Sequence, residues 1–269
     1  KLLLQLHDGE RIECVLLRDD KGHCTACIST QIGCAMGCAF CATGIDGLVR
    51  NLSRGEIVEQ ILHLQRLLAE NERLSHVVVM GMGEPLLNLD ALMPALDETA
   101  ARDGLGIGAR KITISTVGIP AGIKRLAHGA EKGTGPICRN GPSGASHKLD
   151  QSPFPPPSPF PPSPFPPYHL AVSLHAAADE LRNEIMPANR GFGVAAIIAA
   201  ADEYFELTGR RVTFEYVLLS GVNDRPEHAR QLVALLRGRP ALVNLIPYNP
   251  VPGLPFRKPS SAAIARFTE

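Results

Sequence analysis

Short, continuous apolar runs alternate with amphipathic stretches along most of this chain. Continuous apolar runs are typical of strands buried on both faces, whereas apolar residues three and four positions apart are typical of helices. The pattern predicts strands over residues 76–81, 111–115, 169–173, 212–218 and 242–246, with a weaker candidate over 25–29. It predicts helices over residues 54–69, 90–101, 194–207 and 226–236.

The clearest helix is the one predicted over residues 54–69. Ser53 and Glu56 have the spacing of a capping box, which marks a helix start. The apolar residues that follow keep helical spacing: Ile57, Ile61, Leu64, Leu67 and Leu68. Alternating strands and helices, with apolar strands, predict an α/β fold in which helices cover a parallel sheet. About six such units fit, so we expect an open or partial barrel with its chemistry on the loops after the strands.

Residues 129–167 break this pattern. Ten of the 23 prolines lie between Pro153 and Pro167, in a near-repeat of Ser-Pro-Phe-Pro-Pro. Proline has no amide donor and cannot join a strand ladder, which predicts extended polyproline-type or disordered chain. We interpret the segment as a low-complexity, proline-rich surface insertion between a helix and the next strand. A ligand for a proline-binding module is the alternative.

Charge and cysteine content narrow the classes of function. Lysine plus arginine equals aspartate plus glutamate at 27 each, so a whole-chain basic footprint for nucleic acid is absent. No apolar run reaches the roughly 18 residues of a membrane span, so we expect no membrane partner. Six of the seven cysteines lie in the first 41 residues, which indicates a local site. Free thiols there favour a reducing cytoplasm.

Cys34, Cys38 and Cys41 form a C-x3-C-x2-C triplet. Three thiolates at this spacing can hold three irons of a four-iron, four-sulfur cube and leave the fourth iron open to a small molecule. That vacancy points to radical chemistry with S-adenosylmethionine (SAM). A structural zinc site normally needs a second ligand pair, and a disulfide framework is typical of short secreted chains. Both alternatives therefore fit the triplet less well.

Further site candidates follow the predicted strands. Gly81-Met-Gly-Glu-Pro85 comes directly after an apolar strand, and Glu84 there could bind the ammonium of an amino acid. The alternative is a simple turn with Glu84 facing solvent. Small polar groups also end later strands, where they could bind ribose or adenine: Ser115, Ser173, His175 and Asn249. His175 could be a base, or a histidine that packs and bonds to backbone.

Several motifs together resemble one family, the RlmN/Cfr group of radical SAM RNA methyltransferases. The resemblance covers nearly everything except residues 129–167. The matching runs are Cys27-Ile-Ser-Thr-Gln-Ile-Gly-Cys34 with the cysteine triplet, Arg50-Asn-Leu-Ser53, Gly81-Met-Gly-Glu-Pro-Leu-Leu-Asn88, Ile114-Ser-Thr116, Ala171-Val-Ser-Leu-His-Ala176, Gly221-Val-Asn-Asp224 and Asn244-Leu-Ile-Pro-Tyr-Asn-Pro250.

The resemblance implies a radical SAM partial (β/α)6 barrel in which Cys34, Cys38 and Cys41 bind a [4Fe-4S] cluster. It implies SAM contacts at Gly83, Glu84, Ser115, Ser173, Leu174, His175 and Asn249. In this family a cysteine near the C-terminus carries a methyl group to adenine. A second cysteine, which matches Cys27, resolves the RNA–protein adduct through a disulfide. Glu13 matches the family's proton acceptor.

The implied substrates are an adenosine of 23S rRNA and an adenosine of tRNA, methylated at C2. Flavodoxin or ferredoxin is the implied electron donor, and a monomer the implied state. Residues 25–128 and 168–269 match the core, with residues 1–24 as a lead-in. The family's N-terminal domain and methyl-carrying cysteine have no match, so we expect a truncated chain or a divergent homologue. The alternatives are an RNA-binding or regulatory remnant, C8 methylation, or a radical SAM enzyme with another substrate.

Overall fold

One open sheet organises the molecule in the computed structural model, which describes residues 1–101, 103–128 and 168–269. Its strand order is β1-β2-β3-β6-β7-β8-β9-β10. Within these described ranges the strands are β1 (Leu2–Gln5), β2 (Arg11–Arg18), β3 (Cys24–Cys27), β6 (Leu74–Val79), β7 (Ile112–Thr116), β8 (His169–Ser173), β9 (Val212–Leu218) and β10 (Ala241–Pro247).

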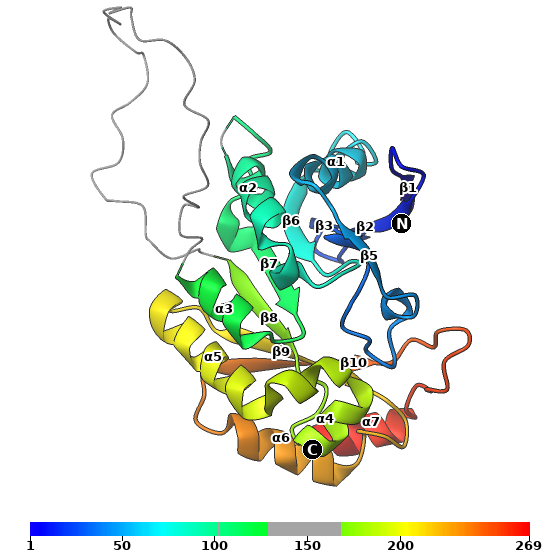
Figure 1. Cartoon of the computed structure of the whole chain (residues 1–269), viewed down its shortest axis with the longest axis vertical. Coiled ribbons are helices and arrows are strands. Elements are labelled where there is room, and N and C mark those ends of the chain that lie inside the picture. Colours follow the sequence, from blue (N-terminus) through cyan, green and yellow to red (C-terminus); the bar gives the residue numbers. More distant parts are fainter. Residues whose placement is uncertain (102, 129–167) are drawn as a thin grey trace, which may run out of the picture.

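In this sheet β3, β6, β7, β8, β9 and β10 run parallel to one another. Strands β1 and β2 extend the sheet at the β3 edge and are antiparallel. In Figure 1 the colours run from blue to orange across the sheet, because each parallel strand is added beside the previous one. The six parallel strands confirm the predicted (β/α)6 pattern. The antiparallel pair adds strands before Cys24 that the apolar runs did not predict.

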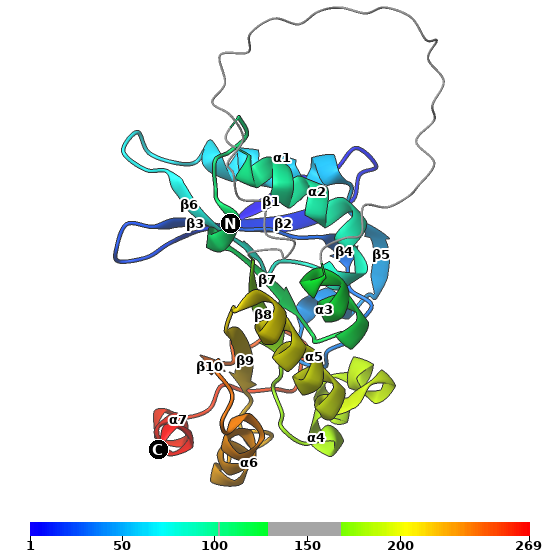
Figure 2. The same cartoon turned by 90° about the vertical axis from the view of Figure 1, so that its left-hand side faces the viewer.

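Helices follow the parallel strands and cover one side of the sheet (Figure 2). Four of them were predicted: α1 (Arg54–Gln65), α2 (Leu89–Ala100), α5 (Gly193–Thr208) and α6 (Pro226–Leu236). Three short helices were not among the predicted ranges: α3 (Pro120–Ala127), α4 (Asp179–Ile185) and α7 (Ser261–Thr268). A small hairpin of β4 (Gln31–Gly33) and β5 (Leu48–Asn51) flanks the cysteine loop.

The start of α1 is as predicted, but its end is not. Ser53 and Glu56 form the capping box. The helix ends at Gln65, and Leu67, placed on the apolar face by its spacing, is 45% exposed. Arg18 donates to the Leu67 carbonyl and Glu72 accepts from the Ala69 amide. These bonds satisfy the backbone outside the helix and turn the chain toward β6.

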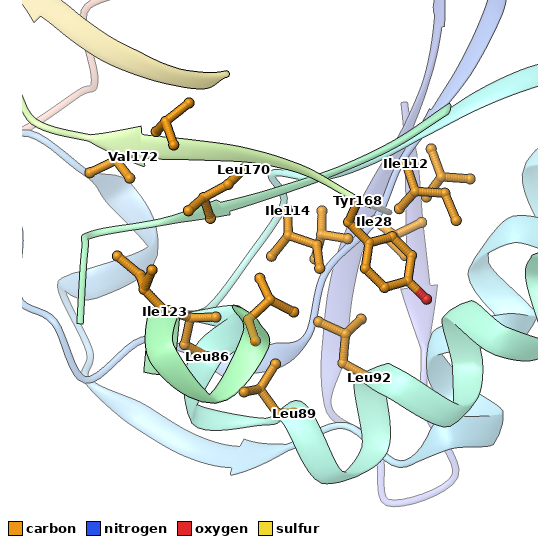
Figure 3. Packing of buried hydrophobic residues seen from close by; sticks show 14 of the residues in the cluster. Ile28, Leu86, Leu89, Leu92, Ile112, Ile114, Ile123, Tyr168, Leu170 and Val172 are labelled. Atoms are coloured by element: carbon orange, nitrogen blue, oxygen red, sulfur yellow. The ribbon is translucent and has the colours of Figure 1, made fainter. Parts of the chain in front are cut away.

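The main core lies between the sheet and its helices (Figure 3). Alternate strand residues point into it, as the period of two in a strand requires. The packed set includes Ile112, Ile114, Leu170 and Val172 from the strands and Leu89, Leu92 and Ile123 from the helices. The intervening strand residues, such as Ser115 and Ser173, therefore lie on the opposite, inner face.

Truncating the α2 side of this core should cost measurable stability. Leu92 is fully buried, so Leu92→Ala should lower the free energy of unfolding by about 2–5 kcal/mol. Leu87→Ala, the same change at a residue that is 43% exposed, should cost much less. Urea unfolding followed by circular dichroism measures both. Equal losses would contradict the core described above.

Two expectations concern the chain outside this core. No helix in the described ranges is long and apolar enough to cross a membrane. The proline-rich insertion over residues 129–167, with Cys138, lies outside the described residues, so its interpretation stays a prediction.

Candidate functional site

The cysteine loop after β3 folds over the carboxyl ends of the parallel strands and closes one side of a cavity. Cys34, Cys38 and Cys41 all line it. The other walls come from the segment after β6 and from the ends of β7 and β8, and include Met80, Gly81, Gly83, Glu84, Ser115, Thr116, Val117, Ser173, His175 and Met186. Ser115, Ser173 and His175, predicted at the ends of successive strands, therefore meet Glu84 at one edge of the sheet, as parallel strands require.

Backbone hydrogen bonds hold the cysteine loop in place. The Cys34 amide donates to the Gly47 carbonyl (2.8 Å) and the Ala39 amide to the Ile185 carbonyl at the end of α4 (2.9 Å). Gly33 has a φ of +73°, and a Cβ there would lie 2.0 Å from the Gly47 oxygen. Only glycine fits this position, because the two arms of the loop touch there.

The surroundings of the cysteine loop disfavour bare thiolates. Among the described residues, no group of three or more histidine, cysteine, aspartate or glutamate side chains is arranged to hold a single metal ion. Burial raises the pKa of the Cys38 thiol to about 12, with Cys41 and Cys34 adding to the effect. Thiolates here therefore need positive charge, which cluster irons supply.

Glu84 does not face solvent, so the simple-turn alternative is wrong. Its side chain is only 1% exposed. The carboxylate accepts hydrogen bonds from the Leu86 amide (3.0 Å) and the Val117 amide (2.8 Å), and thus joins the β6 and β7 ends. Burial raises its pKa to about 7, although these bonds oppose the rise. A carboxylate so desolvated would gain strongly from a cationic ligand.

Gly81 and Gly83, beside Glu84, lie against the chain's own backbone and side chains. A Cβ on Gly81 would lie 2.5 Å from the Ser29 hydroxyl, and one on Gly83, whose φ is +101°, would lie 2.5 Å from the Gln31 Cβ. The missing side chains thus make room for the chain's own loop. Gln31 accepts from the Glu84 amide (2.8 Å), so this contact also orients Glu84.

His175 is buried, with a left-handed φ of +58°. Its Nδ1 accepts from the Val217 amide (2.9 Å), so in the neutral ring the proton is on Nε2. Burial lowers its pKa to about 3, and the charge of Arg182 adds to this. The ring is therefore neutral near pH 7 and a weak base. The geometry favours the packing interpretation, with Nε2–H as a donor on the cavity wall.

The remaining predicted residues divide into two groups. Leu174 is fully buried and is not part of the cavity lining: its amide donates to the Glu215 carbonyl, and its carbonyl accepts from Arg182. Asn249 follows β10 and is exposed, outside the cavity lining. Its neighbour Tyr248 donates to the Phe40 carbonyl (3.3 Å), so the segment does contact the cysteine loop.

Glu13 and Cys27 also lie outside the cavity lining. Glu13 is on β2, half-exposed, and pairs with Lys1 (2.7 Å). Cys27 ends β3 beside Met80; burial raises the pKa of its thiol, and a hydrogen bond from the Met80 backbone opposes this. Neither position tests the role implied by the resemblance.

Two buried residues that support the site were not predicted as site residues. Asn223 is fully buried and joins the ends of β8 and β9: its amide donates to the His175 and Val217 carbonyls (2.8 and 2.7 Å). Its position in the Gly221–Asp224 motif was the available signal. Arg182, on α4, donates to carbonyls behind the cavity wall. A lone arginine in a short helix gave no signal.

Removing the Asn223 amide should loosen this edge of the sheet. Its oxygen also accepts from the Leu219 amide (2.7 Å), so Asn223→Ala leaves three buried backbone groups unpaired. We expect a loss of about 3 kcal/mol or more in the free energy of unfolding. Asn71→Ala, at an exposed turn, is the control and should change it by less than about 0.5 kcal/mol. Chemical denaturation compares the two, and similar values would contradict the bridging role.

Comparisons with known proteins show to which family the chain belongs. The pattern of the Radical SAM superfamily matches residues 28–131. A probable dual-specificity RNA methyltransferase RlmN of Rhodopirellula baltica is 52% identical over 99% of this chain and 62% of its own. The dual-specificity RNA methyltransferase RlmN of Syntrophobacter fumaroxidans is 43% identical over all of this chain and 68% of its own. The crystal structure of a radical SAM methyltransferase from Sphaerobacter thermophilus matches with a TM-score of 0.82 and 42% identity, over 98% of this chain and 67% of that one.

The parallel sheet, with a three-cysteine loop at its carboxyl edge, defines a radical SAM protein. This class uses SAM and an iron–sulfur cluster. At 43% identity over 68% of one relative's length, the chain belongs to the RlmN family of radical SAM RNA methyltransferases. It spans between 62% and 68% of the two relatives' lengths.

Proposed function

We propose that this chain is the catalytic core of a radical SAM methyltransferase acting at C2 of adenosine in 23S rRNA and in tRNA. The observation that carries the proposal is the cavity at the carboxyl edge of the sheet. Three thiols from one loop and the polar ends of β6, β7 and β8 line that single cavity. The names of the relatives, dual-specificity RNA methyltransferases, support RNA as the substrate class.

In this proposal Cys34, Cys38 and Cys41 hold a [4Fe-4S] cluster, which with SAM supplies the radical chemistry. Glu84 receives the ammonium of SAM, because its buried carboxylate lines the cavity. The residues that would bind the rest of SAM are Gly83, Ser115, Ser173 and His175 through Nε2–H, all of which line the cavity. Leu174 and Asn249 are assigned to SAM by the family's pattern alone.

We assign the remaining roles by the family's pattern. Cys27 resolves the RNA–protein adduct, and Glu13 accepts a proton. The position of Cys27 beside Met80, a cavity residue, supports its role. Free thiols at the site suit a reducing cytoplasm, and an electron donor such as flavodoxin or ferredoxin supplies reducing equivalents to the monomer.

Anaerobic reconstitution with iron and sulfide tests the proposal. We expect four irons and four sulfides per chain, as the proposed [4Fe-4S] cluster requires, a broad brown absorbance, and 5′-deoxyadenosine from SAM under reductant. Methylation is read by mass spectrometry of nucleosides from incubated 23S rRNA and tRNA. 2-Methyladenosine supports the proposal and 8-methyladenosine would reassign the position. A colourless protein, or one with a single zinc ion, would overturn the cluster site.

A further inference from the structure

Arg182, on α4, is an arginine that is fully buried behind the cavity wall. Burial lowers its pKa to about 10, so the guanidinium stays charged near neutral pH. A buried charge without a counter-charge costs several kcal/mol. Such a residue needs either an anionic partner or a strong network of acceptors.

The acceptors that the guanidinium contacts are all neutral. Nε donates to the Leu174 carbonyl (2.9 Å), and Nη2 donates to the carbonyls of Val117 (2.5 Å) and Ser173 (2.9 Å). Nη1 donates to the Asn189 side-chain oxygen (2.5 Å). Among the described residues, no ion pair includes Arg182. Its carboxylate neighbour, Asp179, is separated from it by Asn189, whose amide donates to Asp179 (2.8 Å).

The uncompensated charge lies next to the cysteine loop. Val117 and Ser173, whose carbonyls it binds, both line the cavity with the three cysteines. The loop itself rests on α4, because the Ala39 amide donates to the Ile185 carbonyl. Cys38 packs into the same apolar cluster as Val117 and Ile185. The Arg182 guanidinium and Cys38 thus both adjoin the small apolar cluster that contains Val117.

A cluster held by three thiolates carries net negative charge, and one added electron makes it more negative. A nearby fixed cation stabilises the reduced form more than the oxidised form, more strongly so at low local dielectric. We propose that Arg182 is a positioning residue that serves as the built-in counter-charge of the cluster and raises its reduction potential. This inference rests on the proposed cluster at Cys34, Cys38 and Cys41.

Two kinds of variant separate charge from packing. Arg182→Met removes the charge and the hydrogen bonds from the guanidinium to three carbonyls, whereas Arg182→Lys keeps the charge on a smaller head group. The exchange variant, Asp179→Asn with Asn189→Asp, leaves the net charge of the chain unchanged. It moves the carboxylate from position 179, where the Asn189 side chain separates it from the guanidinium, to position 189, which contacts the guanidinium directly. The side-chain oxygen at position 179 could still accept from the Val194 amide. Arg239→Gln, at a partly exposed ion pair with Asp202, is the matched control.

The experiment is a redox titration of each reconstituted full chain, poised with dithionite and followed by electron paramagnetic resonance. One electron passes from the titrant to the cluster, and no bond forms or breaks. We expect reduction to become at least about tenfold less favourable in Arg182→Met and in the exchange variant, a shift of about 59 mV to more negative potential. Arg182→Lys should retain most of the wild-type value, and Arg239→Gln all of it.

The outcomes distinguish this inference from the proposed function. Wild-type protein without iron and sulfide would contradict the cluster site itself. Wild-type and variant proteins with full clusters and equal potentials would overturn the role of Arg182 alone. If Arg182→Met does not fold, the exchange variant decides, because it keeps both the arginine and its hydrogen bonds to the strand carbonyls.

Discussion

Cys38→Ala should abolish cluster assembly. We expect iron and sulfide in the reconstituted protein to fall close to zero, together with the brown absorbance and the release of 5′-deoxyadenosine. Cys38 is the middle thiol of the loop, and among the residues that the structure describes no fourth cysteine lines the cavity. Two thiolates alone hold such a cluster weakly. Iron and sulfide analysis after anaerobic reconstitution measures the loss.

The matched control for this variant is Cys24→Ala. Cys24 is also buried, but it begins β3 and so lies at the amino edge of the sheet, away from the cavity. The Cys24→Ala protein should therefore assemble the full cluster, with a small loss in the free energy of unfolding. If Cys38→Ala retained iron and sulfide at the level of Cys24→Ala, the cysteine loop would not be the cluster site.

Glu84→Gln should weaken SAM binding at least tenfold. The carboxylate accepts from the amides of both Leu86 and Val117, and glutamine would turn its NH2 toward one of these donors. The variant also loses the negative charge of the carboxylate, which in the proposal pairs with the positively charged ammonium of SAM. Anaerobic equilibrium dialysis of the reconstituted protein with SAM measures the affinity. Glu59→Gln, at an exposed position on α1, is the control.

The same carboxylate sets a pH dependence. Burial raises its pKa to about 7, above the ordinary value of 4.5, so the ionised form is lost as the pH falls through 7. Because a cation binds the ionised form, SAM affinity of the wild type should fall between pH 8 and pH 6. In Glu84→Gln the decline should disappear. An equal decline in both proteins would remove Glu84 from the ammonium site.

The fold was largely predictable, because buried parallel strands carry their own signal. The strands over residues 169–173 and 212–218 and the helix over residues 226–236 have the predicted bounds. The exceptions are elements that periodicity cannot detect. Helix α4 has seven residues, too few for a clear helical repeat. Strands β1 and β2 form an antiparallel pair at the sheet edge with many exposed or half-buried residues, so they lack a continuous apolar run.

The candidate site was predictable where strand ends define it and not where tertiary packing does. Glu84 and Ser173 meet because they lie at the carboxyl ends of the parallel strands β6 and β8, and Cys34 lies in the loop that folds over the same edge. That Glu84 is buried follows from the amides of a different strand end, which no local pattern contains. Arg182 is held by the carbonyl of Val117, just after β7, and by that of Ser173, at the end of β8. Both carbonyls belong to other elements than α4, so the sequence around Arg182 does not reveal these contacts.

The positions of the described residues on either side of residues 129–167 have a practical consequence. One side follows α3, and the other leads into the start of β8, which is the amino end of that strand. The cavity lies at the opposite, carboxyl end. A purification tag or fluorescent protein grafted at this junction would therefore be a full strand's length from the chemistry, and the junction offers a place for a handle that leaves the reaction untouched.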